Sequence, residues 1–244
     1  MPPTTPSFTR PLRVSGLSKS YGRRPALEDV TFTIHPGEVL GVIGPNGAGK
    51  TTLFECLAGV MPASAGVLLQ DDHVVGARER RSLLFYMPDA IAPWPAQSLG
   101  WALDFTIRFF GGRAGLRDEV VRSLALEPLL SARMGTLSKG ERKRALLAIG
   151  LLTPQPILLV DEPFDGLDLR QSRELAATLR SHAVRGRTLV LSIHQIAEAA
   201  RLCDRFVLLN AGRVRAEGTL ADLEAQAAVP RAAGDLEEVF LALT

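Results

Sequence analysis

The chain lacks a long apolar run and has only two cysteines. No 18 consecutive apolar residues occur, and the nearest candidate, residues 145–160, is interrupted by Pro154 and Pro156. A helix that crosses a bilayer needs about 20 such residues, so no membrane span is expected. Cys56 and Cys203 stand alone on apolar helical faces, without the partners that a disulfide or a metal site requires. Both are predicted to be buried core residues, which fits a reducing cytoplasm.

The chain also lacks an excess of charge of either sign and an apolar segment at its beginning. Its 28 lysines and arginines nearly balance 26 aspartates and glutamates, which gives no support for a nucleic-acid partner. Residues 1–10 are rich in proline and threonine and have no apolar centre, so we do not expect a secretory signal. The 46% of hydrophobic residues is enough for the core of one large α/β domain or two small ones.

A glycine-rich segment follows a strongly apolar stretch. Residues 39–43 are predicted to form a buried parallel strand, and residues 51–58 a helix. The segment between them matches the pattern Gly, four residues, Gly-Lys-Ser/Thr, whose inward-turned N–H groups and helix N-terminus bind polyphosphates. The alternative is a glycine-rich turn with an incidental lysine. The candidate nucleotide-binding residues are Gly44, Pro45, Asn46, Gly47, Ala48, Gly49, Lys50, Thr51 and Thr52.

Two residues at the end of this loop carry specific chemistry. Lys50 can reach the β- and γ-phosphates of a bound nucleoside triphosphate. The hydroxyl of Thr51 is placed to hold Mg²⁺. The segment therefore predicts that the chain binds a nucleoside triphosphate together with Mg²⁺.

A second apolar strand, residues 157–160, ends in Asp161 and Glu162. Burying a carboxylate there is costly without a cation or hydrogen-bond donors, and a Mg²⁺ at the edge of the sheet resolves that cost. Asp161 is predicted to bind the metal, and Glu162 to orient or deprotonate the attacking water. The alternative is a strand that merely ends in a solvated acidic turn.

The order of the predicted elements favours an α/β fold. Strands near residues 12–17 and 30–34 alternate apolar and polar side chains, which indicates a small antiparallel sheet before the phosphate loop. Residues 89–153 are predicted to be a helical insert. After them strands and helices alternate, which implies a parallel sheet with helical crossovers. The further predicted strands are 67–70, 83–87, 188–193 and 206–210, and the further helices are 169–185, 195–203 and 235–243.

The segment Leu137-Ser138-Lys139-Gly140-Glu141 opens a predicted helix about twenty residues before the acidic strand. Here the chain resembles the ATP-binding subunit of ATP-binding cassette (ABC) transporters, whose pattern is Leu-Ser-Gly-Gly-Gln. Lys139 and Glu141 depart from that pattern. The resemblance implies that Ser138 and Gly140 bind the γ-phosphate of an ATP held by a second subunit.

Further motifs occur in the order of the same family, over roughly residues 10–220. Tyr21 matches the aromatic residue that stacks on adenine, and the alternative is a surface tyrosine. His194 resembles the switch histidine that hydrogen-bonds the γ-phosphate, and the alternative is a structural histidine. Asp168 resembles an aspartate in the loop that touches the opposite subunit, although it could simply cap a helix.

Asp89 is a departure from the family pattern, which usually has glutamine after the strand at residues 83–87. A carboxylate at this position could still ligate Mg²⁺ or water, so Asp89 is predicted as a metal ligand beside Thr51 and Asp161. It also adds negative charge near the phosphates.

The resemblance implies a P-loop NTPase fold: a parallel-sheet core with an N-terminal antiparallel β subdomain and an inserted helical subdomain. Residues 1–244 are predicted to form a single ATPase domain. Its RecA-like core comprises residues 10–88 and 154–220, its helical insert residues 89–153, and its helical tail residues 221–244.

The function implied is an ATP-hydrolysing subunit that powers transport through separate, polytopic membrane subunits. It would lie at the cytoplasmic face of the cell membrane as a peripheral protein. Two copies would sandwich two ATP molecules head to tail, and the aromatic-rich segment 93–110 would contact the membrane subunits. Bacterial export is the expected direction, because importers often carry an added regulatory domain. The alternatives are an importer subunit and a non-transport cassette ATPase of translation or DNA maintenance.

Overall fold

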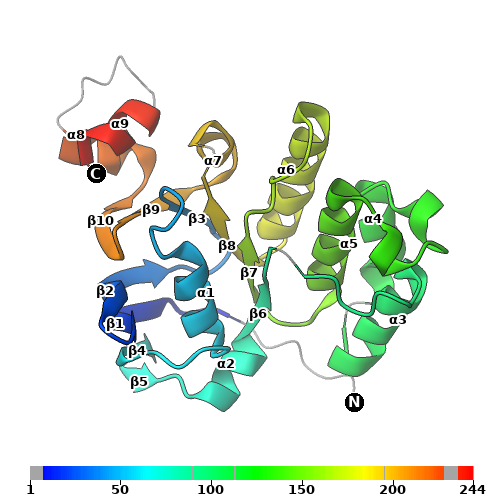
Figure 1. Ribbon diagram of the computed structural model, residues 1–244, viewed down its shortest axis with the longest axis horizontal. Helices are drawn as coiled ribbons and strands as arrows, with labels where there is room; N and C mark the ends of the chain where they lie inside the picture. The colour runs from blue at the N-terminus through cyan, green and yellow to red at the C-terminus, as the bar shows by residue number, and fades with distance from the viewer. Residues whose placement is uncertain (1–7, 90, 113, 195, 228–235, 244) are drawn as a thin grey trace.

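The computed structural model describes residues 8–89, 91–112, 114–194, 196–227 and 236–243 (Figure 1). The strands are β1 Leu12–Tyr21, β2 Arg24–Ile34, β3 Val39–Ile43, β4 Ala65–Gln70, β5 His73–Val74, β6 Leu84–Met87, β7 Ile157–Asp161, β8 Thr188–Ile193, β9 Arg205–Asn210 and β10 Arg213–Gly218. The α-helices are α1 Lys50–Ala58, α2 Ala77–Leu83, α3 Leu99–Phe110, α4 Arg117–Ser123, α5 Lys139–Leu152, α6 Leu169–Val184, α7 Ile196–Leu202, α8 Leu220–Ala227 and α9 Leu236–Leu243. Short 3₁₀ turns span Ala114–Leu116, Glu127–Leu129 and Met134–Thr136.

The central sheet has six strands in the order β10-β9-β3-β8-β7-β6. Strands β9, β3, β8, β7 and β6 run parallel to one another, and β10 pairs with β9 in the antiparallel direction. Strands β3, β7 and β8 are buried along their whole length. Continuous apolar runs are typical of parallel strands whose two faces are both covered, which explains their sequence pattern.

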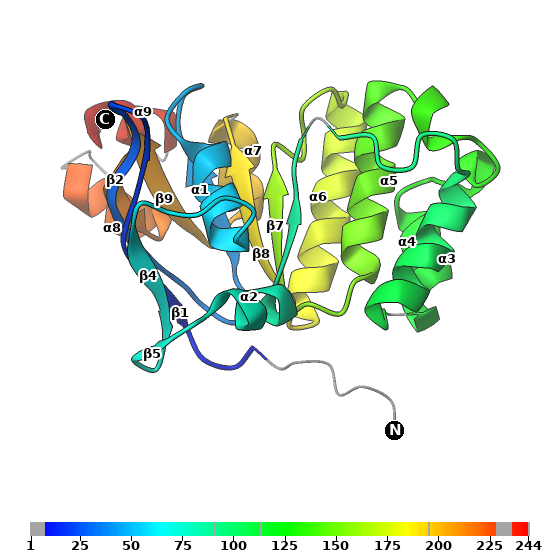
Figure 2. The same ribbon diagram turned by 60° about the horizontal axis from the view of Figure 1, so that its bottom comes forward.

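A second, antiparallel sheet has the order β2-β1-β4-β5. Alternate residues of β2, among them Val30, Phe32 and Ile34, face the protein interior. Figure 2 shows this sheet near α1, at the end of the molecule opposite to α3 and α4. The alternation in the sequence therefore predicted the sheet and its buried face correctly.

Helices and the second sheet cover the two faces of the central sheet. Along β8, Leu189 and Leu191 pack into the apolar cluster formed with α3 to α7, whereas Val190 between them packs with α1 and the antiparallel sheet. Gly41 in β3 has no room for a side chain, because a Cβ there would lie 2.8 Å from the sulfur of Cys203. Cys56 and Cys203 are both free and buried, as predicted.

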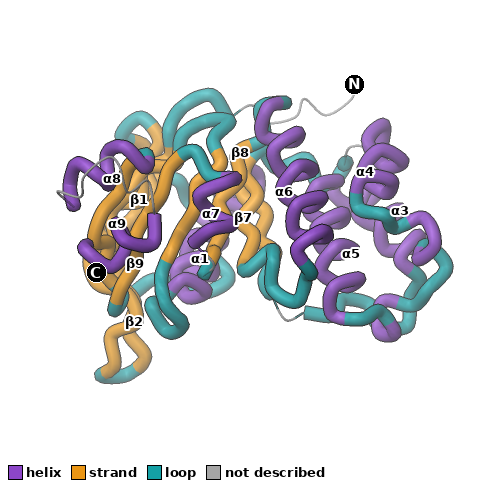
Figure 3. Tube along the Cα trace, turned by 90° about the horizontal axis from the view of Figure 1, so that it is seen from above, coloured by secondary structure: helices purple, strands orange, loops and turns teal. Residues whose placement is uncertain are grey.

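Along the sequence, the helical insert connects the edge strand β6 to β7, its neighbour in the sheet. Ser98 caps α3 by accepting a hydrogen bond from the N–H of Trp101, and Gly111 ends the helix in the left-handed conformation. Figures 1 and 3 show α3, α4, α5 and α6 gathered beyond β7 at one side of the sheet. The predicted insert boundaries at residues 89 and 153 stay a prediction, since α5 shares one apolar core with the sheet.

The predicted α/β fold class is confirmed. The elements that were not predicted from the sequence are short or polar: α2, β5 and β10. Helix α8 falls almost wholly within the predicted helical tail, residues 221–244. Helix α2 has no buried residue, so it carries no apolar pattern to detect. The described residues of α7 and α9 start at Ile196 and Leu236. The predicted first residues of these helices, Gln195 and Asp235, lie outside the described part of the chain.

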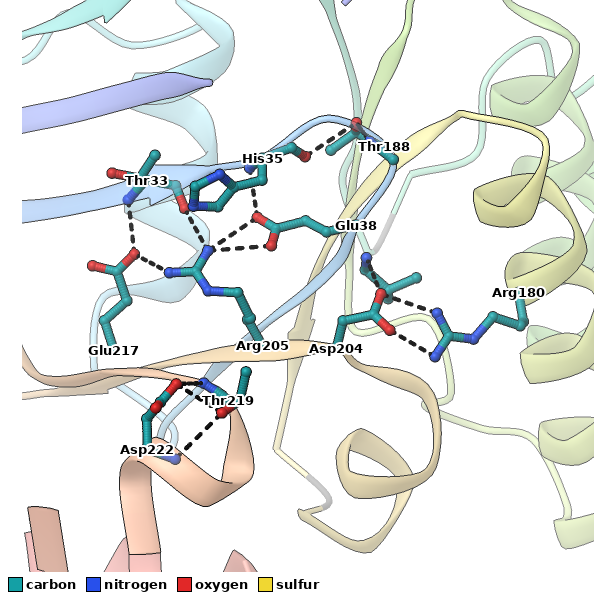
Figure 4. A network of polar contacts seen from close by, with 12 residues as sticks. Thr33, His35, Glu38, Arg180, Thr188, Asp204, Arg205, Glu217, Thr219 and Asp222 are labelled. Atoms are coloured by element: carbon teal, nitrogen blue, oxygen red, sulfur yellow. Dashed lines mark hydrogen bonds and ion pairs between the residues drawn. The ribbon is translucent and has the colours of Figure 1, made fainter. Parts of the chain in front are cut away.

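A polar network ties the C-terminal hairpin β9–β10 to the rest of the core (Figure 4). The guanidinium of Arg205 contacts the carboxylates of Glu38 at 3.2 Å and Glu217 at 2.7 Å, and it also donates to the carbonyl of Thr33. Burial raises the pKa of Glu38, while the N–H of His35 and the charge of Arg205 oppose that rise. Arg205 therefore makes a buried carboxylate tolerable at the bottom of the sheet.

Replacing this cation should destabilise the fold in a pH-dependent way. Arg205→Met is expected to lower the free energy of unfolding by about 2–4 kcal/mol near neutral pH, because it leaves the buried carboxylate of Glu38 uncompensated. Without the guanidinium, the pKa of Glu38 in the folded variant rises further above its value in the unfolded chain. The variant is therefore closest to the wild type in stability at low pH, and it loses stability as the pH rises through that raised pKa. Urea denaturation should thus give a smaller deficit at about pH 5 than at about pH 8. The surface variant Arg170→Met is the control and should match the wild type; an equal deficit for Arg205→Met at both pH values would contradict the role of Glu38.

Candidate functional site

Four strand ends meet at one edge of the central sheet. The register pairs Ile43 with Ile193, Asp161 with Ser192, and Met87 with Val160. The segments that follow these strands therefore all begin at the C-terminal edge of the sheet. The glycine-rich loop follows β3, and Asp89 lies in the segment after β6. Asp161 is the last residue of β7 and Glu162 follows it, while Ser192 lies near the end of β8 and His194 follows that strand. Ligands of open parallel sheets bind at such an edge.

The glycine-rich loop wraps one wall of an open cavity of about 890 Å³. Gly49 precedes α1 with φ +106°, and a Cβ there would lie 2.7 Å from the carbonyl oxygen of Ala26. A Cβ on Gly44 would lie 2.1 Å from the carbonyl oxygen of Leu209. Gly49 thus requires glycine for both conformation and space, and Gly44 requires it for space. The loop residues that line the cavity are Pro45, Asn46, Gly47, Gly49, Lys50, Thr51 and Thr52.

Ala48 and Gly44 support the loop rather than line the cavity. Ala48 is buried, and its backbone accepts a hydrogen bond from the N–H of Gly212 and donates one to the carbonyl of Pro45. These contacts anchor the loop to the turn between β9 and β10. The anchored loop presents its remaining N–H groups as a preformed concave surface.

Lys50 is the cation at the centre of the cavity. Its side chain is only 6% exposed, and its ammonium donates to the carbonyl of Gly44 at 2.8 Å. The same ammonium lies 3.3 Å from a carboxylate oxygen of Glu162. The N-terminus of α1 adds partial positive charge at this point, so the site is prepared for a polyanion.

Asp161 is buried, and two hydroxyl groups hold its carboxylate. Thr51 donates to one oxygen at 2.7 Å, and Ser192 donates to the other. Burial and the negative charge of Asp161 raise the pKa of Tyr86, which therefore stays protonated beside the carboxylate. Hard oxygen donors suit Mg²⁺, so Thr51 and Asp161 fit the metal that accompanies nucleotide phosphates. Among the described residues, no group of three or more His, Cys, Asp or Glu side chains could bind a metal by itself.

Glu162 has a strained backbone and a clamped carboxylate. Its φ is +49°, a left-handed conformation that is uncommon outside glycine, and its N–H donates to the hydroxyl of Ser192 at 2.9 Å. One carboxylate oxygen faces Lys50, and the other lies 2.5 Å from Nδ1 of His194. The structure therefore brings together the two predicted catalytic residues and the lysine of the phosphate loop.

Tyr21 forms a different wall of the same cavity. The ring is about half exposed, its hydroxyl contacts the sulfur of Met61, and the ammonium of Lys19 lies 5.5 Å from the ring centroid. An exposed aromatic face beside a phosphate loop can stack on a nucleobase.

Ser138 and Gly140 do not line this cavity. Ser138 caps α5 by accepting from the N–H of Glu141, and the carboxylate of Glu141 accepts from the N–H of Ser138 in return at 2.8 Å. Glu141, a departure from the family pattern, thus completes a capping box. Lys139 pairs with Asp165 at 2.7 Å, which raises the pKa of Lys139. Asp168 caps α6 in the same manner, by accepting from the N–H of Gln171.

Asp89 lines the cavity, and its carboxylate forms an ion pair with Lys143 of α5. Its role as a metal ligand stays a prediction, as do the roles of the other site residues. No role was predicted for Lys143 or Ser192 from the sequence. The only signal for Ser192 was its position at the end of a buried strand, and the signal for Lys143 was a lysine on an otherwise buried helical face.

The profile of the ABC transporter family matches residues 27–165, more than half of the chain. The chain belongs to this family. It is an ATP-binding subunit that hydrolyses ATP, and such subunits work as dimers together with transmembrane subunits. None of the helices in the described part of the chain has the length and apolar character that crossing a bilayer requires.

Individual relatives agree with the family assignment. The chain is 33% identical over 215 residues to the sn-glycerol-3-phosphate import ATP-binding protein UgpC 1 of Rhizobium johnstonii, covering 86% of the chain and 58% of that relative. It is 35% identical over 218 residues to the Nod factor export ATP-binding protein I of Rhizobium sp. (strain N33), covering 84% of the chain and 70% of that relative. A solved structure of the ATP-binding subunit of an ABC transporter superimposes with a TM-score of 0.85 at 31% identity, over 95% of this chain and 98% of that one.

Removing the cation of the phosphate loop should nearly abolish nucleotide binding at ordinary ATP concentrations. Lys50→Ala is expected to weaken ATP binding by about 2–4 kcal/mol, because it removes the charge that faces the phosphates. Isothermal titration calorimetry with ATP measures the loss, and an unchanged melting temperature verifies the fold. Wild-type affinity for ATP in this variant would contradict the assignment of this loop as the phosphate-binding loop.

Proposed function

We propose that this ATPase subunit powers export of a substrate through separate membrane-spanning subunits at the cytoplasmic face of the cell membrane. The export direction is supported by the relative named Nod factor export ATP-binding protein I. The observation that carries the membrane partner is an exposed aromatic surface on the helical insert. We call it the aromatic surface and define it as Trp94, Trp101, Phe105, Phe109 and Phe110. Exposed apolar patches on an ATPase of this family are candidate sites for a protein partner.

The aromatic surface is one connected row of rings. Trp101 stacks on Phe105 at 5.0 Å between centroids, and Phe105 stacks on Phe109 at 5.4 Å. Trp101 is 40% exposed and Phe109 is 68% exposed. Residues four apart on a helix share one face, so α3 presents these rings together. Aromatic side chains of this kind dominate the binding energy of protein interfaces.

The row continues into a groove beside the central sheet. Phe110 makes an edge-to-face contact with Phe85 of β6, with 5.5 Å between the centroids. Phe85 and Phe110 line an apolar cavity of about 600 Å³ that also reaches Pro88 and Ile91. A helix of a membrane subunit seated here would contact the segment that carries Asp89, and so would lie next to the nucleotide cavity. This proximity supports mechanical coupling between ATP hydrolysis and the partner.

The proposed site roles follow from the same edge of the sheet. Glu162 orients or deprotonates the attacking water, and His194 contacts the γ-phosphate. Mg²⁺, held through Thr51 and Asp161, would neutralise developing charge on the phosphates. Ser138 and Gly140 would complete the site of a second copy in a head-to-tail dimer, which agrees with their absence from the cavity wall of their own chain.

Import is the second candidate function. The relative from Rhizobium johnstonii carries import in its name, and its identity to this chain is close to that of the Nod factor export protein. The direction can be tested by mass spectrometry of cells whose only copy carries Glu162→Gln. Blocked export should accumulate a compound inside the cells, and blocked import should leave a compound in the medium. The second outcome would overturn the proposed direction.

The aromatic surface should be needed for assembly but dispensable for the isolated subunit. Phe109→Ser is expected to weaken binding to the membrane subunits about tenfold or more, because burying a phenylalanine contributes about 1.5–3 kcal/mol. The fraction of subunit that stays on washed membranes measures this. Val184→Ser is the control, since Val184 is even more exposed but lies on α6. Equal retention of both variants on the membranes would show that the aromatic surface does not bind the membrane subunits.

Glu162→Gln should trap an ATP-bound dimer. An amide can still hydrogen-bond water but cannot take its proton, so ATP stays intact while binding is preserved. Size-exclusion chromatography with Mg-ATP is expected to show a dimer, and adding Ser138→Ala should return it to a monomer. A dimer that persists unchanged with Ser138→Ala would argue against the composite site.

A further inference from the structure

We infer that Lys143 is a positioning residue for ATP hydrolysis. Its side chain contacts both the carboxylate of Asp89 and the backbone of Glu162. Lys143 lies near the start of α5 and is only 6% exposed. Its ammonium donates to the carbonyl oxygen of Glu162 at 2.7 Å and forms an ion pair with the carboxylate of Asp89. The inference rests on the proposed role of Glu162 as the residue that activates water.

The backbone of Glu162 needs support on both sides. A residue with φ +49° persists only where its surroundings fix it. The hydroxyl of Ser192 accepts from the N–H of Glu162 at 2.9 Å, and Lys143 holds its carbonyl. The direction of the Glu162 carboxylate depends on this backbone, since its Cα–Cβ bond turns with the two peptide groups. Lys143 therefore acts on the general base through its main chain, without contacting its carboxylate.

Asp89 makes the buried ammonium of Lys143 tolerable. Within the described part of the chain, Asp89 is the only acidic side chain that forms an ion pair with Lys143. A buried ammonium without an acidic partner would be strongly destabilising. The ion pair also explains how this chain tolerates the carboxylate of Asp89 close to the phosphate site, because Lys143 neutralises the charge of that carboxylate. Three segments are thereby joined: α5, the segment after β6 and the segment after β7.

A positioning role and a purely structural role predict different kinetics. If Lys143 only stabilised the fold, its removal would lower the melting temperature and leave the activity of folded molecules unchanged. If it orients Glu162, its removal lowers kcat while the KM for ATP changes little, because the phosphate loop is intact. Charge repair can separate the two, since it restores the neutrality of the buried pair without restoring the donor to the Glu162 carbonyl.

The experiment compares Lys143→Met, Lys143→Arg and the double variant Asp89→Asn with Lys143→Met, by ATPase kinetics and thermal melting of the full chain. We expect Lys143→Met to lower kcat about tenfold or more, as a displaced catalytic group does, with KM within about twofold of the wild type. Lys143→Arg should recover part of the rate because it keeps the charge and the donors. The double variant should melt close to the wild type but keep the low kcat.

A matched control lies one residue further along α5. Arg144 donates to the carbonyls of Leu124 and Ala125, and Ala125 also has a positive φ of +49°. Arg144→Met therefore removes a similar cation from a similar strained carbonyl, at a position that does not line the nucleotide cavity. It should lower the melting temperature without changing kcat per folded molecule.

Two results would overturn the inference: wild-type kcat in Lys143→Met, or recovery of kcat in the double variant. If Lys143→Met does not fold, the double variant is compared with Asp89→Asn alone, because Asp89 itself lines the nucleotide cavity. Equal kcat in these two variants would then overturn the inference. Glu162→Gln is measured alongside. If that variant hydrolyses ATP at the wild-type rate, the proposed role of Glu162 fails, and that failure is distinct from a failure of Lys143.

Discussion

The register of the parallel strands is the constraint on which the site depends. Strands β3, β8, β7 and β6 end at nearly the same height, with Ile43 opposite Ile193 and Asp161 opposite Ser192. A phosphate loop, an acidic pair, a histidine and Asp89 then leave the sheet at a single edge. Because side chains alternate between the two faces of a strand, a slip of one residue would exchange the two apolar cores and turn Asp161 away from Thr51. The two buried cores and the catalytic geometry therefore depend on the same backbone hydrogen bonds.

Charge at this edge is arranged in pairs that nucleotide binding can rearrange. Glu162 lies between the ammonium of Lys50 and the imidazole of His194, and Asp161 accepts from two hydroxyl groups. Each of these groups has a local partner in the described structure, so no charge is left buried without compensation. A polyphosphate that enters the loop offers Lys50 and His194 a stronger partner than one carboxylate, and it would free Glu162 for water. The pairs thus hold the site in an arrangement that is prepared for the nucleotide.

The insert extends this edge toward a partner. Its first segment carries Asp89, its helix α3 carries the aromatic surface, and its helix α5 returns with Lys143 to the backbone of Glu162. The insert therefore carries both the proposed docking surface and the lysine that contacts the backbone of the proposed general base. This connection gives a physical route by which a membrane subunit could sense the state of the nucleotide site.

Local sequence determined much of this protein. The phosphate loop needs glycine at positions where a Cβ would strike a backbone carbonyl, so Gly44 and Gly49 identified it from the sequence alone. The buried runs of β3, β7 and β8 and the caps at Ser98, Ser138 and Asp168 are local signals of the same kind. The partners of Asp89 and Glu162 were decided only by the tertiary structure. The ion pair of Asp89 and Lys143 joins residues 54 positions apart, and the contact of Ser192 with Glu162 joins residues 30 positions apart. Such contacts leave no periodic pattern in a sequence, because they arise from the order of strands in the sheet and from the way α5 packs against its edge.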